Sequence, residues 1–159
     1  MSSSRGRSLR ALGVDLGSKR IGLATCDAGG RLASPYDVIP ASRDHAQVHR
    51  RLAAIVAEEE VEVVVVGYPL SLDGSRGPAA RAAEVRASAL AAVLDVPVVL
   101  HDERLTTVTA HQLLAAQGLD SRARRKVVDR AAAAVLLQTW LDGGSPMSLV
   151  ADPSGPPEE

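Results

Sequence analysis

A run of four consecutive valines, Val63–Val66, constrains the fold of this chain more than any other segment. β-Branched residues favour strands, and a strand that is apolar on both faces needs cover on both sides. Helices packed on both faces of a parallel sheet provide that cover, and Gly67 and Pro69 end the run. We therefore expect a central parallel strand over 61–66 in an α/β fold.

The segments around this strand predict the element order β-β-β-α-β-α-β-α. Short apolar segments separated by turn residues indicate strands, and apolar residues at helical spacing indicate helices. The expected strands cover 11–15, 20–26, 31–39, 61–66 and 96–100, and the expected helices cover 81–94, 106–117, 121–141 and a segment that starts at the N-cap Ser42. This order implies a five-stranded mixed sheet with helices on both faces.

The chain is expected to hold one domain with a tail at each end. Its 159 residues suit a single core, and with 2% aromatic residues and no Phe, small aliphatic side chains must fill that core. Residues 1–10 are rich in Ser and Arg, and residues 143–159 contain four prolines. We expect both ends to be disordered, which leaves a folded domain over 11–142.

The composition excludes several classes of protein. A single cysteine, Cys26, cannot form an intrachain disulfide, and no segment resembles a signal peptide or a membrane span. We therefore expect a cytoplasmic protein that does not contact a membrane. The net charge of -1 gives no global indication of a nucleic-acid partner, so any such indication must come from local clusters of cations.

Asp15 is the clearest candidate for a functional residue. It lies within an otherwise apolar stretch, Leu12–Leu16, where its carboxylate would lose its hydration unless a cation were nearby. The alternative is that Asp15 only stabilises the turn before Gly17. At the edge of an open sheet where parallel strands end, however, a carboxylate indicates a binding site.

Two further carboxylates are predicted to reach the same edge. Asp102 and Glu103 end the fifth strand, and because neighbouring strand residues point to opposite faces, only one of the two would face a common site. Asp129 lies among apolar neighbours on the last expected helix. It is either part of the site or paired with Arg125 one turn earlier.

Three carboxylates without cysteine or clustered histidine are typical ligands of Mg²⁺ or Mn²⁺. A pair of such ions about 4 Å apart can activate water, hold a phosphate in line and stabilise the alkoxide that leaves. The acids therefore indicate a metal-dependent phosphodiester hydrolase.

Cations close to these acids in sequence favour a nucleic-acid substrate. Lys19 and Arg20 follow Asp15, Arg104 follows Glu103, and residues 121–130 hold five cations against one acid. Basic residues beside a carboxylate cluster can neutralise backbone phosphates. The alternative for 121–130 is an ordinary solvated helix face. The glycine-rich segment 67–78 matches no nucleotide-binding loop and is expected to be a mobile loop that lines the site.

Three blocks of residues resemble the YqgF type, also called RuvX-like, of ribonuclease H-fold proteins related to Holliday-junction resolvases. The blocks are Gly13–Ala24, Val66–Gly74 with Gly77, and Asp102–Thr107 continued by Arg125–Asp129 and Ala131–Ala132. Together they span about residues 11–142. Tyr68 and Ser71 depart from the family pattern, which commonly has Leu and Asn there, and both departures lie in or beside the loop.

The resemblance implies which residues do the chemistry. It implies that Asp15, Glu103 and Asp129 form the catalytic metal site, which selects Glu103 over Asp102. It also implies that Lys19, Arg20 and Arg104 contact substrate phosphates. Arg125 and Lys126, from the basic stretch 121–130, are expected to have the same role. Mg²⁺ or Mn²⁺, as two ions, would be the cofactor.

The resemblance further implies trimming of the 5′ end of precursor 16S ribosomal RNA. Alternatives are cleavage of four-way DNA junctions and a non-catalytic RNA-binding role in ribosome assembly. An ATP-binding module like the actin-like kinases is disfavoured, because those proteins close two such domains around the nucleotide. A junction resolvase would favour a homodimer, whereas an RNA-trimming enzyme could act as a monomer.

Overall fold

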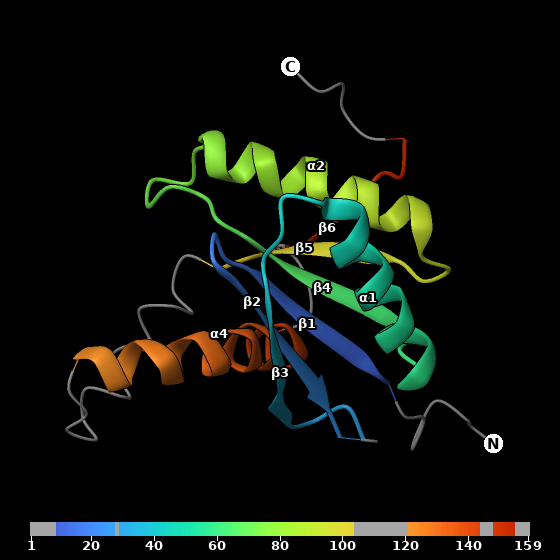
Figure 1. The fold of residues 1–159 in the computed structure, drawn as a ribbon, viewed down its shortest axis with the longest axis horizontal. Helices are drawn as coiled ribbons and strands as arrows, with labels where there is room; N and C mark the ends of the chain where they lie inside the picture. The colour runs from blue at the N-terminus through green and yellow to red at the C-terminus, as the bar shows by residue number, and fades with distance from the viewer. Residues whose placement is uncertain (1–8, 28, 104–120, 144–147, 155–159) are drawn as a thin grey trace.

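The computed structural model describes residues 9–27, 29–103, 121–143 and 148–154. Within these ranges the chain forms one six-stranded sheet and helices on both of its faces (Figure 1). The strands are β1 (Ala11–Leu16), β2 (Arg20–Cys26), β3 (Ala33–Pro40), β4 (Val63–Tyr68), β5 (Val98–Asp102) and β6 (Ser148–Val150). The helices are α1 (His45–Glu58), α2 (Pro78–Val93) and α4 (Ser121–Gly143).

The sheet has the strand order β3-β2-β1-β4-β5-β6. Strands β1, β2 and β3 form an antiparallel meander, and β4 and β5 then add in parallel to β1. Every residue of β4 is buried, as the valine run predicts. The expected mixed α/β sheet is therefore confirmed, while the helix expected over 106–117 lies outside the described residues.

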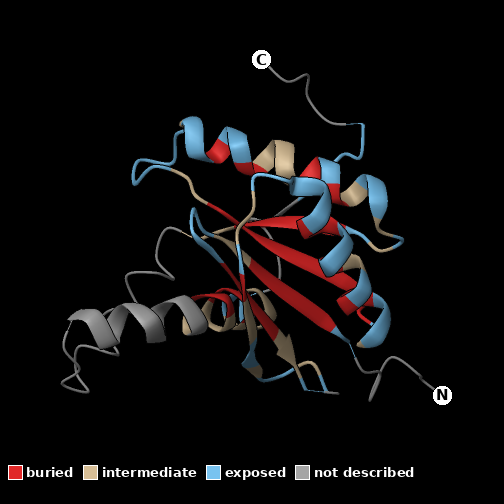
Figure 2. Ribbon diagram, in the orientation of Figure 1, coloured by how far each residue is buried: buried red, intermediate tan, exposed pale blue. Residues whose placement is uncertain are grey.

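Two separate cores lie on the two faces of the sheet (Figure 2). Helices α1 and α2 cover one face and α4 covers the other (Figure 1). Among the side chains that the structure describes, the buried hydrophobic residues apart from Tyr68 are all Ala, Val, Leu or Ile, so small aliphatic side chains fill this part of the core. Trp140 packs against the cluster under α4.

Helix α4 approaches the sheet closely because β1 has a glycine at the contact. A Cβ atom built on Gly13 would lie 3.0 Å from both the carbonyl oxygen of Ala133 and the Cβ of Leu137. The close fit fixes the height of α4 over β1, and therefore over the carboxyl end of that strand.

Several element boundaries differ from the sequence expectation. Helix α1 is capped by Asp44 rather than Ser42, because the Asp44 side chain accepts a hydrogen bond from the Gln47 N–H at 3.2 Å. Helix α2 starts at Pro78, three residues before the expected start, because proline suits the first turn of a helix. Strands β4 and β5 both continue two residues further, to Tyr68 and Asp102, because parallel pairing extends beyond the apolar runs.

Strand β6 is an addition to the five expected strands. It lies in the 143–159 segment for which we expect disorder, and the structure differs at residues 148–154. Backbone groups on the open edge of β5 need partners, and β6 supplies them in antiparallel register. Just beyond β6, Ala151 is buried and its N–H donates to the Val98 carbonyl at 2.7 Å. None of the described helices combines the length and hydrophobicity of a membrane span.

Candidate active site

The candidate active site lies where β1, β4 and β5 end. Val14 of β1 is paired with Val66 of β4, so the next residues of the two strands are Asp15 and Gly67. Gly67 is paired with His101 of β5, and Glu103 follows directly after that strand. The parallel register therefore brings Asp15 and Glu103, which are 88 positions apart in the sequence, to one edge of the sheet.

The side chain of Glu103 lies over Gly67. A Cβ atom built on Gly67 would overlap the Glu103 Oε1 atom and lie 3.0 Å from its Cδ. The Glu103 N–H donates to the carbonyl oxygen of Tyr68 at 3.2 Å, which holds the backbone against the end of β4. The carboxylate thus occupies the space that a β4 side chain would fill.

The environment of Glu103 disfavours its ionised form. Burial is the largest cause, followed by the negative charges of Asp15 and Asp102, and together they raise the pKa of Glu103 to about 7. The electrostatic contribution shows that the structure brings Asp15 within reach of Glu103. The charge of Asp102 also raises the pKa of Glu103, so closeness to Glu103 does not by itself distinguish Asp102 from Asp15 as a residue of the site.

Two of the predicted substrate-binding residues lie where the chain passes from β1 to β2, Lys19 in the turn and Arg20 at the start of β2. Lys19 and Arg20 are exposed to solvent there. The Gly17 N–H donates to the carbonyl oxygen of Arg20 at 3.0 Å, and a Cβ on Gly17 would overlap that oxygen, so the turn needs glycine. This tight turn keeps both cations near the end of β1.

The side chains of the other predicted site residues lie outside the part of the chain that the structure describes. Arg104 lies outside the described residues. Arg125, Lys126 and Asp129 belong to the α4 helix, but only their backbone is described. Among the side chains that are described, no group of three or more metal-binding residues occurs.

The backbone of α4 nevertheless gives the position of residue 129. Position 129 comes one turn before Ala133, which contacts Gly13, and two turns before Leu136, which lies 3.5 Å from a Cβ built on Gly67. The first turns of α4 extend past the carboxyl ends of β1 and β4 (Figure 1).

A pocket of about 350 Å³ opens beside Glu103. It lies between the turn after β1, the ends of β4 and β5, and the first half of α2. Its lining residues are Leu16, Gly17, Ser18, Gly67, Pro69, Ala79, Ala82, Ala83, Arg86 and Glu103. Arg86 is the one cation among them. The sequence analysis did not identify Arg86 as a site residue. Arg86 comes three residues after Ala83 and four residues before Leu90, which are both buried, and this helical spacing places it on the buried face of α2.

Hydrogen bonds hold the segment 69–77 beside this pocket. Arg76 donates from Nε and Nη2 to the two carboxylate oxygens of Glu84 on α2, at 2.7 and 2.6 Å. The hydroxyl group of Tyr68 also donates to Glu84. The hydrogen bonds from Arg76 are the main reason that the pKa of Glu84 is lowered. This segment, expected to be a mobile loop, is therefore tied to α2 through Arg76.

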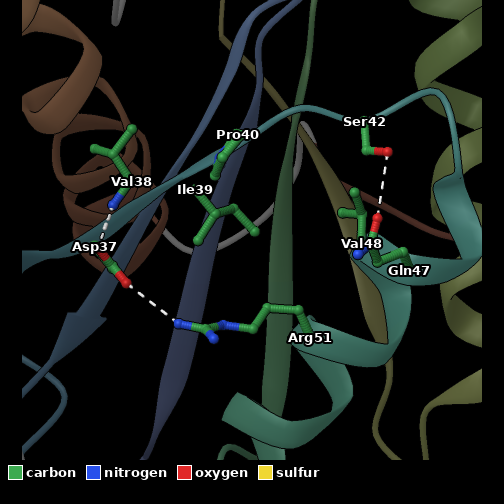
Figure 3. Close-up of a pocket in the computed structure, with 8 residues that line it drawn as sticks. All are labelled: Asp37, Val38, Ile39, Pro40, Ser42, Gln47, Val48 and Arg51. Carbon is green, nitrogen blue, oxygen red and sulfur yellow. Dashed lines mark hydrogen bonds and ion pairs between the residues drawn. The ribbon is translucent and has the colours of Figure 1, made fainter.

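A second pocket, of about 400 Å³, lies between β3 and α1 (Figure 3). Arg51 and Asp37 form an ion pair across it at 3.6 Å, so the two charges compensate each other. None of the predicted site residues lines this pocket. Glu103, the charge of Asp15 that acts on it and the cation of Arg86 make the region of the first pocket the candidate active site.

Comparisons with known proteins point to one family. A family model described as "RuvX: Holliday junction resolvase" matches residues 9–143. A Rhodococcus opacus protein named "Putative pre-16S rRNA nuclease" is 47% identical over 137 residues, covering 84% of this chain and 77% of the relative. A Streptomyces avermitilis protein of the same name is 49% identical over 134 residues, covering 84% and 85% of the two chains.

The fold also matches a solved structure. The structure of Thermus thermophilus RuvC in complex with a Holliday junction substrate aligns with a TM-score of 0.56 and 17% sequence identity. The alignment covers 89% of this chain and 99% of RuvC. At this level of identity the likeness concerns the fold alone, and it confirms the expected ribonuclease H-like architecture.

Proposed function

Because this chain belongs to the RuvX family, we propose that it is a divalent-metal-dependent nuclease that trims the 5′ end of precursor 16S ribosomal RNA in the cytoplasm. The family membership supports the reaction class, and the names of relatives that are 47% and 49% identical support the substrate. The structural observation that carries the proposal is the partly buried carboxyl group of Glu103, on which the charge of Asp15 acts.

The donor groups at this site suit a hard divalent cation. Carboxylate oxygens are the preferred ligands of Mg²⁺ and Mn²⁺, and a buried carboxyl group beside two other acids is stabilised in its ionised form by a bound cation. We assign Asp15 and Glu103 as ligands, with Asp129 as the third. Such a cation would stabilise the negative charge that develops on the phosphate during hydrolysis.

The position of α4 supports the assignment of Asp129. Gly13 and Gly67 both face α4, and Asp15, two residues after Gly13 on the same strand, faces the same side of the sheet. Residue 129 precedes Ala133 by one turn, so it lies on the face of α4 that packs on the sheet. We therefore assign Asp129, rather than Asp142 at the other end of α4, to the site with Asp15.

The protein's own residues divide the remaining tasks. Asp15 and Glu103 create a negative, partly desolvated site that attracts the cation and excludes bulk water. Lys19 and Arg20, exposed beside it, would bind backbone phosphates and hold the strand across the end of the sheet. We assign Arg104, Arg125 and Lys126 to the same task, from their positions in sequence.

Cleavage of four-way DNA junctions is the second candidate function, favoured by the description of the family as a Holliday junction resolvase. A resolvase must make two symmetric cuts, which a two-fold homodimer would provide, whereas an RNA-trimming enzyme acts as a monomer or a homodimer. A preference for four-way junctions would therefore be accompanied by a homodimer, whereas a preference for RNA is compatible with either a monomer or a homodimer.

The test compares two substrates in Mg²⁺ and in Mn²⁺. The purified protein is incubated with 16S ribosomal RNA that carries a 5′ extension and with a four-way DNA junction, and Asp15→Asn serves as the inactive control. We expect cleavage of the RNA extension that is lost in the variant. Cleavage of the junction alone would favour the resolvase, and binding of RNA without any cleavage would indicate a non-catalytic assembly factor.

A further inference from the structure

Arg86 carries a buried positive charge with incomplete pairing. It lies on the buried side of α2, between Ala83 and Leu90. Its Nε and Nη2 atoms are buried, and within the part of the chain that the structure describes neither has a hydrogen-bond partner. Buried guanidinium groups normally form several hydrogen bonds, so an unsatisfied one requires an explanation.

The titratable groups that the structure describes around Arg86 do not hydrogen-bond its two buried nitrogen atoms. Its charge acts on His49, a buried residue of α1, and lowers the pKa of that imidazole after the larger effect of burial. Glu84, the acid on the same helix, is already bound by Arg76. Burial lowers the pKa of Arg86 itself, which shows that the guanidinium is held at an electrostatic cost.

The pocket beside Arg86 has room for an anion. Gly17, Ser18 and three alanines of α2 line it with small side chains, and Glu103 borders it on the side of the proposed metal site. The pocket is therefore continuous with the place where the scissile phosphate would lie. A nucleic-acid strand that crosses this edge of the sheet has a further phosphate on each side of the one that is cleaved.

We propose that Arg86 is a phosphate-binding residue, and that the pocket between the turn after β1 and α2 takes a backbone phosphate next to the scissile one. The inference rests on the proposed nuclease function. The guanidinium fork can bind two phosphate oxygens at once, and a rotation of the Arg86 side chain toward the pocket would bring its two buried nitrogen atoms to them. The energetic cost of burying Arg86 is then offset when substrate is bound.

The test measures binding in a chain that cannot cleave. In an Asp15→Asn background, Arg86→Met removes the charge but keeps an unbranched side chain, and Arg50→Met removes an exposed cation of α1 as a matched control. Affinity for the 5′-extended RNA is measured over a range of salt concentrations. We expect Arg86→Met to weaken binding about tenfold and to reduce the salt-dependence slope by about 0.7–0.9, the value for one phosphate contact. Arg50→Met should change neither quantity.

Thermal unfolding shows whether the loss is specific. Replacing an unsatisfied buried cation by an apolar side chain is expected to leave the melting temperature unchanged or to raise it. Inorganic phosphate should raise the melting temperature of the Asp15→Asn parent more than that of the Arg86→Met variant. If phosphate stabilises both proteins equally while the Arg86→Met variant still binds RNA more weakly, the pocket binds a phosphate only as part of a nucleic acid. If Arg86→Met does not fold, Arg86→Gln replaces it.

The outcomes separate this inference from the proposed function. Unchanged RNA affinity and salt slope in the Arg86 variant would overturn the role of Arg86, even if the wild-type protein cleaves RNA. If the Arg86 variant binds RNA more weakly but the wild-type protein does not cleave it, the nuclease proposal is wrong and the assignment of Arg86 as a phosphate-binding residue is still supported.

Discussion

The carboxylate of Glu103 lies in the space above Gly67 that any other residue would fill with its own side chain. The two residues belong to neighbouring parallel strands, one on β4 and one just after β5, and the pairing of Gly67 with His101 aligns them. The absence of a side chain on β4 thus permits a partly buried acid at the end of β1, where Asp15 lies.

Gly67→Ala is expected to displace Glu103. The new Cβ would overlap the carboxylate, so the side chain must rotate away from Asp15, and a misplaced reactive group commonly costs about 100-fold in activity. Overpacking should also destabilise the protein by about 1–3 kcal/mol. Gly29→Ala is the control, because a Cβ there would approach nothing closer than 3.9 Å. Cleavage and thermal unfolding measure the two effects, and full activity in Gly67→Ala would contradict the assigned position of Glu103.

Glu103→Gln is expected to stabilise the metal-free protein at high pH. The pKa of Glu103 is about 7 in the folded state against 4.5 for a free side chain, so between these values the folded state retains a proton that the unfolded state releases. Glu103 therefore favours folding most below about pH 4.5, and this contribution is lost as the pH rises through 7. The amide cannot ionise, which should raise the free energy of unfolding by roughly 1–3 kcal/mol at pH 8 relative to the wild type.

The comparison is made by urea unfolding in the presence of a chelator at pH 4 and pH 8. Glu58→Gln, an exposed position on α1, should show no such difference between the two pH values. An equal effect of Glu103→Gln at both pH values would mean that the pKa of Glu103 is not raised.

Asp15→Asn is expected to lower the pKa of Glu103 as well as to remove cleavage. The negative charge of Asp15 is one of the causes that raise this pKa, and the amide removes that charge without changing the shape of the side chain. Carbon-detected NMR titration of the glutamate carboxyl groups measures the change. Asp37→Asn, which removes an acid that is paired with Arg51, should leave the pKa of Glu103 where it is.

Cation binding is expected to depend on pH around neutrality. A carboxyl group must lose its proton before it can act as a ligand, so Mn²⁺ affinity should rise by up to about tenfold per pH unit below 7 and level off above it. Calorimetric titration between pH 5.5 and 8.5 tests this. Glu103→Gln should bind Mn²⁺ more weakly and without this slope, and a wild-type affinity that is flat with pH would argue against Glu103 as a ligand.

Tyr68→Phe is expected to loosen the segment 69–77. The change removes the hydrogen bond from the Tyr68 hydroxyl to the partly buried Glu84, at a cost of about 1 kcal/mol in the free energy of unfolding. Tyr36→Phe removes a hydrogen bond to Glu59 at an exposed position and should cost less. A double-mutant cycle with Arg76→Met should show coupling to Tyr68 and none to Tyr36.

Much of the fold follows from local patterns in the sequence. The valine run predicts a strand buried on both faces because apolar side chains at every position need cover on both sides, and β4 is buried throughout. Asp15 stands out for a similar reason, since an acid within an apolar strand must face something other than hydrocarbon. Such features depend on neighbours along the chain, which the sequence lists in order.

Contacts between distant residues were decided only by the tertiary structure. Nothing near Gly67 in sequence indicates that Glu103 will lie over it. The spacing of Arg86 places it on the buried face of α2, but nothing near it indicates that two of its nitrogen atoms will lack hydrogen-bond partners. Strand β6 forms because the edge of β5 offers unpaired backbone groups, not because of its own residues. These relationships depend on how the strands align and how closely the helices approach, and packing sets both only when the whole chain has folded.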